Sequence, residues 1–321
     1  MDIVYIPLLW DVPYYNFALE EYLLESKKHC GNYLFFYVHR PSVIIGAHQN
    51  AYKEVNAAYL EENKIILARR ISGGGAVYHD SGNLNYSIIL NEKEKGKISL
   101  DRFSEHIIRS LKRLGADCTF TGRNDILYEG RKISGSAQCI KEGRLLHHAT
   151  IMYDVDIEKM SAALSPAKAK LTAKGVDSVK SRVGNLKQAL CGAGIEEIKS
   201  EVIKEIAAGE TLLDEEDISI IRKKVLDKFS RRQYNYGEKK DFGIEKTCRT
   251  EAGTISARVL TDGTMIKDVC LTGDFFVTGD ISLTVKELIG ADYSIEGIIG
   301  AVKDSRIFGF SVKDLAELLL R

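Results

Sequence analysis

The stretch RRISGGGAVYHDSGNLNYS, from Arg69 to Ser87, most constrains how this chain can fold. Three adjacent glycines lose much conformational freedom on folding and pack nothing, so such a run suits a sharp turn or a close approach to a ligand. The run joins two strand-like segments and does not open a helix, so it is a poor match to P-loop and dinucleotide-binding loops. It predicts a glycine-rich β-hairpin over an acyl phosphate, and a bulged hairpin without a ligand satisfies the same residues.

Bulk composition restricts the possible partners. The 321 residues exceed the usual size of one core, which predicts a large domain and a smaller one. Lys plus Arg and Asp plus Glu both number 45, so no net charge attracts nucleic acid or an anionic membrane, and any anion must be held locally. The six cysteines include no CxxC pair, and the N-terminus has no basic segment before a short apolar run. We therefore expect a soluble, cytoplasmic protein.

Hydrophobic patterning predicts mixed secondary structure throughout. Strands are expected at residues 3–9, 34–38, 42–46, 64–68 and 84–90, and helices at 14–27, 103–114 and 213–229. The polar segment 231–243 precedes two further strands, 254–260 and 264–271, joined by an Asp262-Gly263 turn, and a helix capped at Ser311. These patterns predict an α+β protein with domains at residues 1–240 and 241–321.

A second cluster, GRNDILYEGRKISGSAQ at residues 122–138, adds charge near small residues. Asp125 suits Mg²⁺ and Lys132 suits a phosphate, so together with the glycine run they supply the parts of an adenylate-forming site. Taken singly, Asp125 also fits a turn-capping aspartate, and Lys132 a solvated surface lysine. Farther on, His147 and His148 adjoin a strand, where neighbours face opposite ways, so they make a poor metal pair. Pocket lining and simple packing both remain open for His148.

These segments together resemble the lipoate-protein ligase A family. The resemblance also takes in Asn16 with EEYLL, PSVIIGAHQN at 41–50, KGVDSVKSRVGNL at 174–186 and GDFF at 273–276, so it covers nearly the whole chain. It implies a class II biotin/lipoate ligase-like catalytic domain, a mixed sheet flanked by helices, followed by a small C-terminal α+β accessory domain.

The resemblance also implies an activity. The family converts lipoate and ATP, with Mg²⁺, into lipoyl-AMP and transfers the lipoyl group to a lysine of apo lipoyl domains. The carriers implied are E2 subunits of 2-oxoacid dehydrogenases and the H protein of glycine cleavage. We expect a monomer with no nucleic-acid or membrane partner.

Site residues follow from the matched motifs. Lys132 is the expected catalytic residue, in contact with the lipoyl carboxylate and the α-phosphate. The resemblance places lipoate and phosphate at Arg70, Ser72, Gly73, Gly74, Gly75, Lys132, Ser134, Gly135 and His148, the nucleotide at Val77, Tyr78, His79, Asp80, Asn83, Asn124 and Asp125, and the metal at Asp125. The loop from Lys174 to Arg182 would cover the adenylate and exclude water. Where the family commonly reads HHGT, this chain has Ala149, which either narrows the pocket or faces the core.

Three other interpretations remain. A cysteine-dependent octanoyl or lipoyl transferase would use Cys118, fourteen residues before Lys132, as a thioester nucleophile without ATP. A biotin ligase shares the fold, but the RRxSGGG and GRKxSGxA spacings belong to the lipoate branch. A non-catalytic binder of lipoyl domains would need neither Asp125 nor Lys132.

Overall fold

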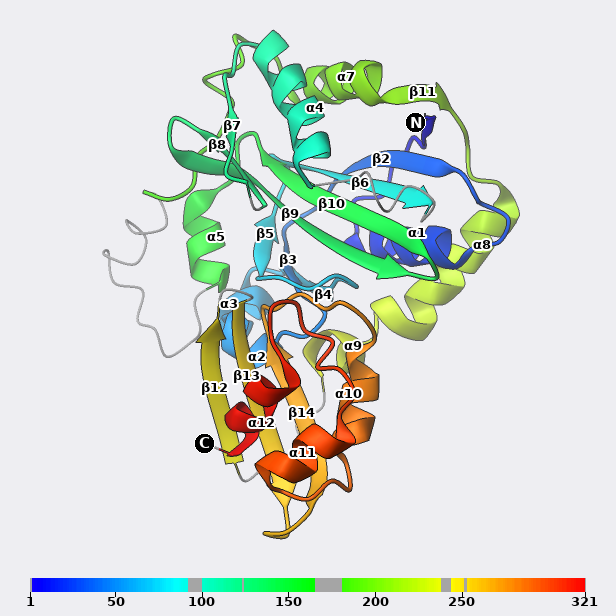
Figure 1. The fold of residues 1–321 in the computed structure, drawn as a ribbon. Helices are drawn as coiled ribbons and strands as arrows, with labels where there is room; N and C mark the ends of the chain where they lie inside the picture. The colour runs from blue at the N-terminus through cyan, green and yellow to red at the C-terminus, as the bar shows by residue number, and fades with distance from the viewer. Residues whose placement is uncertain are drawn as a thin grey trace. The chain divides into compact units, whose positions relative to one another are not determined.

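The computed structural model describes residues 2–91, 100–122, 124–164, 181–237, 244–250 and 253–320. Its internal contacts divide it into two units, one formed by residues 1–44, 52–69 and 77–235, the other by 45–51, 70–76 and 236–321. The prediction of an α+β protein with a mixed sheet, flanking helices and a small C-terminal domain is confirmed (Figure 1). The predicted boundary at 240/241 lies outside the described residues and stays a prediction.

An eight-stranded mixed sheet forms the centre of the first unit, in the order β11-β1-β2-β6-β10-β9-β8-β7. The strands are β1 (Ile3–Tyr5), β2 (Asn32–Val38), β6 (Asn83–Asn91), β7 (Thr119–Phe120), β8 (Asp125–Tyr128), β9 (Arg131–Lys141), β10 (Arg144–Met152) and β11 (Ala207–Glu210). β1 pairs in parallel with β2 and β11, and the remaining pairs are antiparallel. Turns at Glu129-Gly130 and Glu142-Gly143, all with positive φ, join β8, β9 and β10 as consecutive hairpins.

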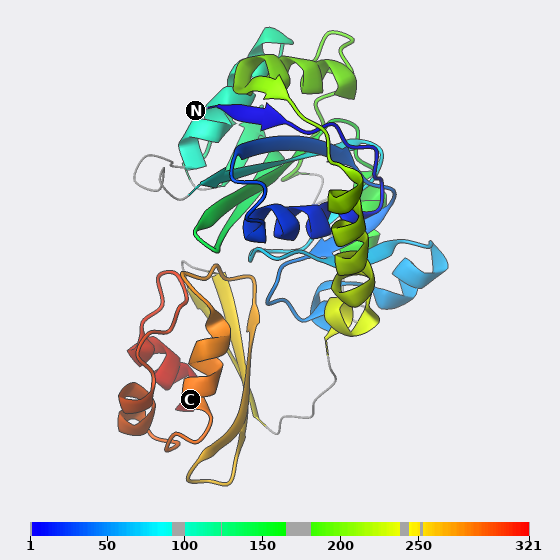
Figure 2. The same ribbon diagram turned by 90° about the vertical axis from the view of Figure 1, so that its right-hand side faces the viewer.

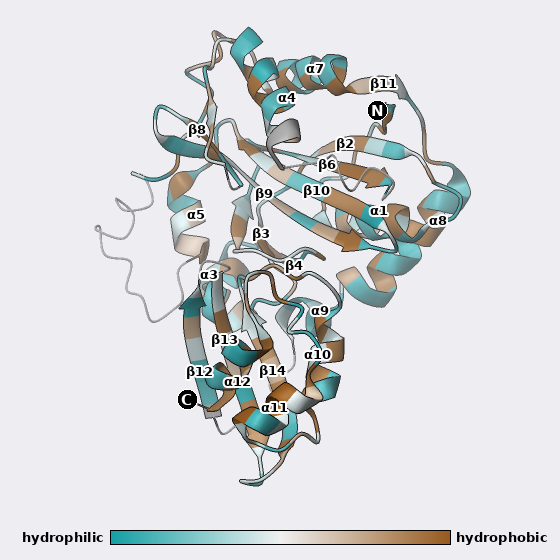
Figure 3. Cartoon of the chain, viewed as in Figure 1, coloured by the Kyte–Doolittle hydropathy of each residue, from teal (hydrophilic) through white to brown (hydrophobic). Residues whose placement is uncertain are grey.

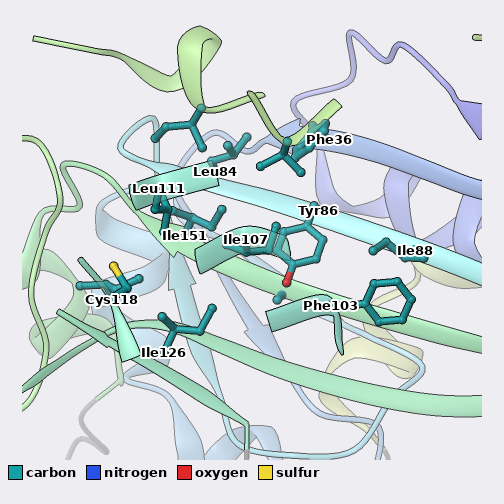
Figure 4. Packing of buried hydrophobic residues seen from close by; sticks show 14 of the residues in the cluster. Phe36, Leu84, Tyr86, Ile88, Phe103, Ile107, Leu111, Cys118, Ile126 and Ile151 are labelled. Atoms are coloured by element: carbon teal, nitrogen blue, oxygen red, sulfur yellow. The ribbon is translucent and has the colours of Figure 1, made fainter. Parts of the chain in front are cut away.

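Helices cover both faces of this sheet. α4 (Leu100–Arg113) and α7 (Ile195–Ile206) lie on one face, and α1 (Pro13–Glu25) lies on the other beside α8 (Glu215–Lys224) (Figures 1 and 2). Pro13 stands in the first turn of α1, where its missing N–H costs nothing. The main core lies between the sheet and the α4–α7 pair; Figure 4 shows part of it, including Tyr86 of β6 and Ile107 of α4.

The remaining elements of this unit include short helices and a second sheet. The helices are α2 (Ala51–Glu54), α3 (Ala57–Glu62), α5 (Ile157–Leu164), α9 (Arg232–Tyr236) and the π-helical turn Val225–Phe229. The second sheet has the order β4-β3-β5, with β4 (Ile66–Arg69), β3 (Ser42–Ile45) and β5 (Val77–His79). The expected glycine-rich hairpin is therefore wrong. β3 lies between the two strands that the glycine loop joins, so the loop crosses from one edge of the sheet to the other.

The C-terminal part of the second unit is a three-stranded antiparallel sheet with three helices. Its strands are β12 (Ile244–Thr250), β13 (Gly253–Thr261) and β14 (Ile266–Gly273), and its helices are α10 (Ile281–Leu288), α11 (Ile295–Ala301) and α12 (Val312–Leu320). The strands carry both hydrophobic and hydrophilic residues (Figure 3). The predicted turn and helix cap are both present: Asp262 Oδ1 accepts from the N–H of Thr264 and Met265, and Ser311 and Asp314 bond reciprocally. No helix of the described residues is long and apolar enough to cross a membrane.

Candidate functional site

The register of the central strands separates the sheet into a core face and a polar face. His148 of β10 lies opposite Ser87 of β6 and Ala137 of β9, and Asn85 of β6 lies opposite Tyr37 of β2. Because alternate residues of a strand share a face, these side chains are all on one side of the sheet. Ala149, the departure from the family's HHGT, lies opposite Tyr86 and belongs to the core, so its methyl group does not narrow the polar face.

A β-bulge brings Lys132 to the polar face. Across the β8–β9 pair Asp125 lies opposite Gly135, Ile126 opposite Ser134 and Leu127 opposite Lys132, which leaves Ile133 as an extra residue in β9. In strict alternation Lys132 and Gly135 would face opposite ways; the extra residue puts them on the same side. Ile133 is fully buried in the core, while Lys132 Nζ lies 2.7 Å from Asp125 Oδ1.

Gly135 provides the space beneath the lysine. A Cβ at this position would lie 2.7 Å from Lys132 Nζ and 2.8 Å from its Cε, and 3.6 Å from Asp125 Oδ1. The Gly135 N–H donates to Thr150 Oγ1 of β10 at 3.2 Å. Asp125 of β8 and Lys132 and Gly135 of β9 therefore form a compact group on two hairpin-linked strands. Ser134, in contrast, lies opposite the core residue Ile126 and is 2 % exposed, so a ligand would have to contact its backbone.

A buried carboxylate of α1 gathers hydroxyl and imidazole groups on the same face. Glu20 is fully buried, and its Oε1 accepts from Ser87 Oγ at 2.6 Å and from Tyr37 OH at 3.4 Å. His148 Nδ1 lies 2.9 Å from the same oxygen, which places the histidine in this network and not in isolated packing. Among the described residues, Glu20 Oε2 and both amide atoms of Asn16, one turn earlier on α1, have no hydrogen-bond partner. Buried polar atoms of this kind favour a polar ligand group nearby, since leaving one unpaired costs about 1–3 kcal/mol.

Two further imidazoles meet at the end of β5. His39 Nδ1 and His79 Nδ1 are 3.0 Å apart, so one ring donates and the other accepts. Burial lowers the pKa of His39 to about 3, which keeps that ring neutral across the physiological range. Burial also raises the pKa of Tyr78, next to His79, and the nearby Asp80 charge adds to this shift. Tyr78 OH is buried without a hydrogen bond to any described residue.

Most of the predicted nucleotide residues lie in β5 and in the turn from β5 into β6. Asp80 Oδ1 accepts from the Gly82 N–H at 2.9 Å and its Oδ2 from the Asp156 N–H at 3.0 Å, so this carboxylate already holds two backbone segments. Asn83 donates to Asn85 Oδ1 at 2.8 Å. At the start of β8, the Asn124 carbonyl accepts from both the N–H and the hydroxyl of Ser136. Binding of a nucleotide by these residues and by Val77 stays a prediction.

The glycine loop is shaped by its own arginine. Arg70 Nη2 donates to the carbonyls of Gly73 and Gly75 at 2.7 and 2.8 Å, and its Nε donates to the buried Ser72 hydroxyl at 3.1 Å. Gly74 has φ +91, a region that favours glycine. The loop belongs to the second unit, where a Cβ on Gly73 would lie 2.3 Å from the Phe275 carbonyl oxygen. Close backbone packing thus accounts for part of the glycine run, and ligand binding by the loop stays a prediction.

Arg69, the other arginine of the stretch, has a different environment. Its Nε donates to the Tyr234 carbonyl and its Nη2 to the Asn235 carbonyl, each at 2.9 Å, while its backbone N–H donates to the Asn235 side chain. The guanidinium therefore fastens β4 to α9. The guanidinium of Arg70, in contrast, donates to carbonyls of the glycine loop itself.

Cys118 does not have the environment of a nucleophile. Its side chain is 5 % exposed and lies within the core beside Leu111 and Ile126 (Figure 4). Burial, with a smaller effect of the Asp117 charge, raises the pKa of the thiol to about 12. A catalytic cysteine needs a stabilised thiolate, so this environment is evidence against the thioester mechanism.

The predicted metal ligand, Asp125, is the carboxylate of the group around Lys132. Within the described part of the chain, no three His, Cys, Asp or Glu side chains group as metal ligands. This arrangement fits Mg²⁺, which is commonly held by one or two carboxylates together with substrate phosphates and water. Binding of Mg²⁺ by Asp125 stays a prediction.

Comparison with known proteins defines the class. The model for the lipoyl protein ligase A/B catalytic domain matches residues 12–207, and the model for the bacterial lipoate protein ligase C-terminus matches residues 239–319. The chain thus combines a lipoyl ligase catalytic domain with a ligase C-terminal domain.

Individual relatives agree with this class. The lipoate-protein ligase LplJ of Bacillus subtilis is 36% identical over 313 residues, which cover 94% of this chain and 95% of that protein. The chain belongs to the lipoate-protein ligase A family. A bipartite lipoate protein ligase from Thermoplasma acidophilum, studied with its E2 lipoyl domain, is 29% identical with a TM-score of 0.66 over 76% of this chain and 100% of its own. A lipoate-protein ligase A bound with ATP is 28% identical, with a TM-score of 0.62 over 74% of this chain and 99% of its own.

Sequence reasoning predicted Asp125, Lys132, Gly135 and His148 and missed the carboxylate that meets His148. The signal was present: Glu20 lies four residues after Asn16 in a helix whose other positions are mostly apolar. Two polar residues at that spacing share one face of a helix. Ser87 and Tyr37 carried no comparable signal, because a hydroxyl inside a strand is ordinary.

Proposed function

We propose that this chain activates free lipoate with ATP and transfers the lipoyl group to a lysine of a lipoyl carrier domain. A carboxylate oxygen of lipoate attacks the α-phosphorus, the bond from that phosphorus to the bridging oxygen breaks, and pyrophosphate leaves. The amine of the carrier lysine then attacks the acyl carbon of lipoyl-AMP, AMP leaves, and the nitrogen loses its proton. The observation that carries this proposal is the Lys132–Asp125 pair on the polar face of a lipoyl ligase catalytic domain.

Lys132 has a role in both half-reactions. Its ammonium group opposes the charge on the attacking carboxylate and α-phosphate, and later the charge on the oxyanion at the acyl carbon. The ion pair with Asp125 keeps it on the polar face before substrates bind. Asp125 would hold Mg²⁺, which would disperse phosphate charge when bound.

The buried network of α1 is proposed to meet the acyl chain. Glu20, His148 and Ser87 present polar atoms on the same face as Lys132, together with the Asn16 amide. Buried polar groups disfavour an acyl chain that leaves them unpaired, so this network would discriminate between chains. We assign lipoate contacts to this network and to Arg70, Ser72 and the three loop glycines, and nucleotide contacts to residues 77–80, Asn83 and Asn124.

We propose the E2 subunits of 2-oxoacid dehydrogenases and the H protein of glycine cleavage as carriers. The support is the family membership and the T. acidophilum relative, which was studied with its E2 lipoyl domain. We further propose that the chain acts in the cytoplasm as a monomer.

An intact-mass assay of an apo lipoyl domain tests the proposed reaction. With lipoate and Mg²⁺, modification should require ATP and release pyrophosphate. Lys132→Ala should lower the rate at least a hundredfold, since removal of one charge-stabilising group typically costs 10²–10³ in kcat. Lys204→Ala, which removes an exposed lysine of α7, is the matched control and should react normally. Modification from an acyl carrier thioester without ATP would overturn the proposal.

A further inference from the structure

The main chain of Lys132 is fixed on the side away from β8. Its N–H donates to the Arg182 carbonyl at 2.9 Å, and its carbonyl accepts from the Gly184 N–H at 2.9 Å. This is a parallel bridge between Lys132 and Val183. Residues 182–184, which are distant in sequence, therefore satisfy both backbone polar groups of the catalytic lysine.

The segment is itself anchored to the body of the first unit. The Asn185 side chain accepts from the Val155 N–H at 3.0 Å and donates to the Val155 carbonyl at 2.9 Å. The next residue, Leu186, is fully buried in the core and its N–H donates to the Met152 carbonyl. Residues 182–184 are thus presented to β9 from a fixed point at the end of β10.

Two independent features then determine where the ammonium group lies. The extra residue Ile133 selects the face of the sheet to which Lys132 points. The bridge to residues 182–184 holds the backbone from which that side chain extends. A change in the bridge would therefore tilt or shift the ammonium relative to Asp125 and Gly135.

We propose that Gly184, through its N–H bond to the Lys132 carbonyl, is a positioning residue for the catalytic lysine. This inference rests on the proposed function, in which Lys132 binds the carboxylate of lipoate. Gly184 is the member of the bridge that a single substitution can disconnect, because proline lacks the N–H and places its ring toward the acceptor. Alanine retains the N–H, and its Cβ would lie 3.2 Å from Arg131 Cβ and 3.5 Å from Arg131 Nε, at the start of a flexible side chain.

Binding of lipoate and of its neutral amide, lipoamide, measured by calorimetry, separates positioning from general damage. The ratio of the two affinities measures the interaction of the Lys132 ammonium with the carboxylate, because the two ligands differ only at that group. Gly184→Pro should reduce the lipoate preference roughly tenfold, as expected for loss of a hydrogen bond to a charged group, and leave lipoamide binding unchanged. Gly184→Ala should retain most of the preference, and in the Lys132→Ala background the proline should have no further effect.

Each outcome decides a different claim. A preference that survives Lys132→Ala would refute the role of Lys132 in the proposed function. A preference that disappears in Lys132→Ala but survives in Gly184→Pro would refute only the positioning role. Equal losses for both ligands in Gly184→Pro would mean that the segment supports the pocket as a whole.

Hydrogen exchange of the unaltered protein keeps the inference testable if Gly184→Pro does not fold. The amides of Lys132 and Gly184 should exchange at matching rates, and lipoate should slow both of them. Independent exchange of the two amides would contradict the coupling.

Discussion

At the scale of single residues, the position of Lys132 depends on a neighbour that contributes no side chain. Gly135 leaves open the volume into which the lysine folds, and the atoms that a methyl group would meet are the flexible end of that lysine. The Lys132 side chain can relieve this steric conflict by moving its Cε and Nζ atoms. A substitution at Gly135 therefore affects the site more than it affects the fold.

Gly135→Ala is expected to lower the lipoylation rate at least tenfold, with the melting temperature changed by no more than about 2 °C. The added methyl group would displace the ammonium from its place beside Asp125. Steady-state lipoylation and thermal unfolding measure the two effects. Gly209→Ala is the control, because a Cβ there meets nothing within 4 Å. Unfolding of Gly135→Ala, or full activity, would contradict this explanation.

The sequence predicted the charged members of the site but not their arrangement. Lys132 and Asp125 were proposed because the two residue types suit phosphate and Mg²⁺. Residue type gave no signal for the bulge at Ile133. An isoleucine is common in regular strands, so nothing indicates that this one has no partner residue in β8. The buried roles of Arg69 and Asp80 were also missed, because hydrogen bonds to a distant backbone depend on tertiary structure alone.

At the scale of elements, one arginine joins three segments of the first unit. Arg144, the first residue of β10, is 6 % exposed and donates to the carbonyls of Leu23, His29 and Gly31. It thereby attaches the β9–β10 hairpin to the end of α1 and to the segment leading into β2. Burial lowers the pKa of this guanidinium, which remains charged.

Arg144→Met should lower the free energy of unfolding by about 2–4 kcal/mol, because it removes the donor to the buried Leu23 carbonyl and to the part-buried carbonyls of His29 and Gly31. Arg144→Lys should restore only part of this loss, since one ammonium cannot reproduce the planar fork. Arg109→Met, which breaks an ion pair with Glu205 at a half-exposed position, should cost less than about 1 kcal/mol. Urea unfolding measures all three, and equal losses for Arg144→Met and Arg109→Met would show that Arg144 carries no special weight.

Patterning predicted most of the elements and failed where residues are small. Strands at 34–38, 42–46 and 84–90 and the helix at 14–27 were correct within a few residues. β9 was not predicted, because its ISGSA sequence has low strand propensity and is typical of a loop. Pairing with β8 on one side and β10 on the other holds these residues extended. The turn residues Glu129 and Glu142 were equally inconspicuous, although the glycine after each is a hairpin signal.

At the scale of the whole molecule, buried histidines make stability depend on pH. Burial lowers the pKa of His39 and of His147 to about 3, and the charge of His148 adds to the effect on His147. Both values lie below the usual 6.5, so the unfolded chain takes up protons first as the pH falls. The stability from neutral burial is complete above about pH 6.5 and is lost progressively toward pH 3.

Between pH 6.5 and 5, the free energy of unfolding should fall by up to about 1.4 kcal/mol per pH unit for each of these histidines. His147→Asn should reduce that slope by the contribution of one histidine, up to about 1.4 kcal/mol per pH unit. This reduction is expected whether or not the substitution changes the stability at pH 8. Although burial opposes it, hydrogen bonds from Lys141 and Lys228 lower the pKa of Glu21 to about 2. The stability from this carboxylate is complete above about pH 4.5 and is lost toward pH 2, so Glu21 does not add to the slope between pH 6.5 and 5. Urea unfolding at several pH values measures the slope, and an unchanged slope in His147→Asn would refute this account.

The place of β1 in the sheet has a consequence for synthesis. Residues Ile3–Tyr5 pair with β2, which follows within a few dozen residues, and with β11, which begins only at Ala207. As the chain emerges from the ribosome, the first strand waits for a partner made much later, with one edge exposed in the meantime. Such long-range pairing slows folding and leaves nascent chains open to misassociation. The nascent chain is thus open to misassociation through the free edge of β1 until β11 has left the ribosome.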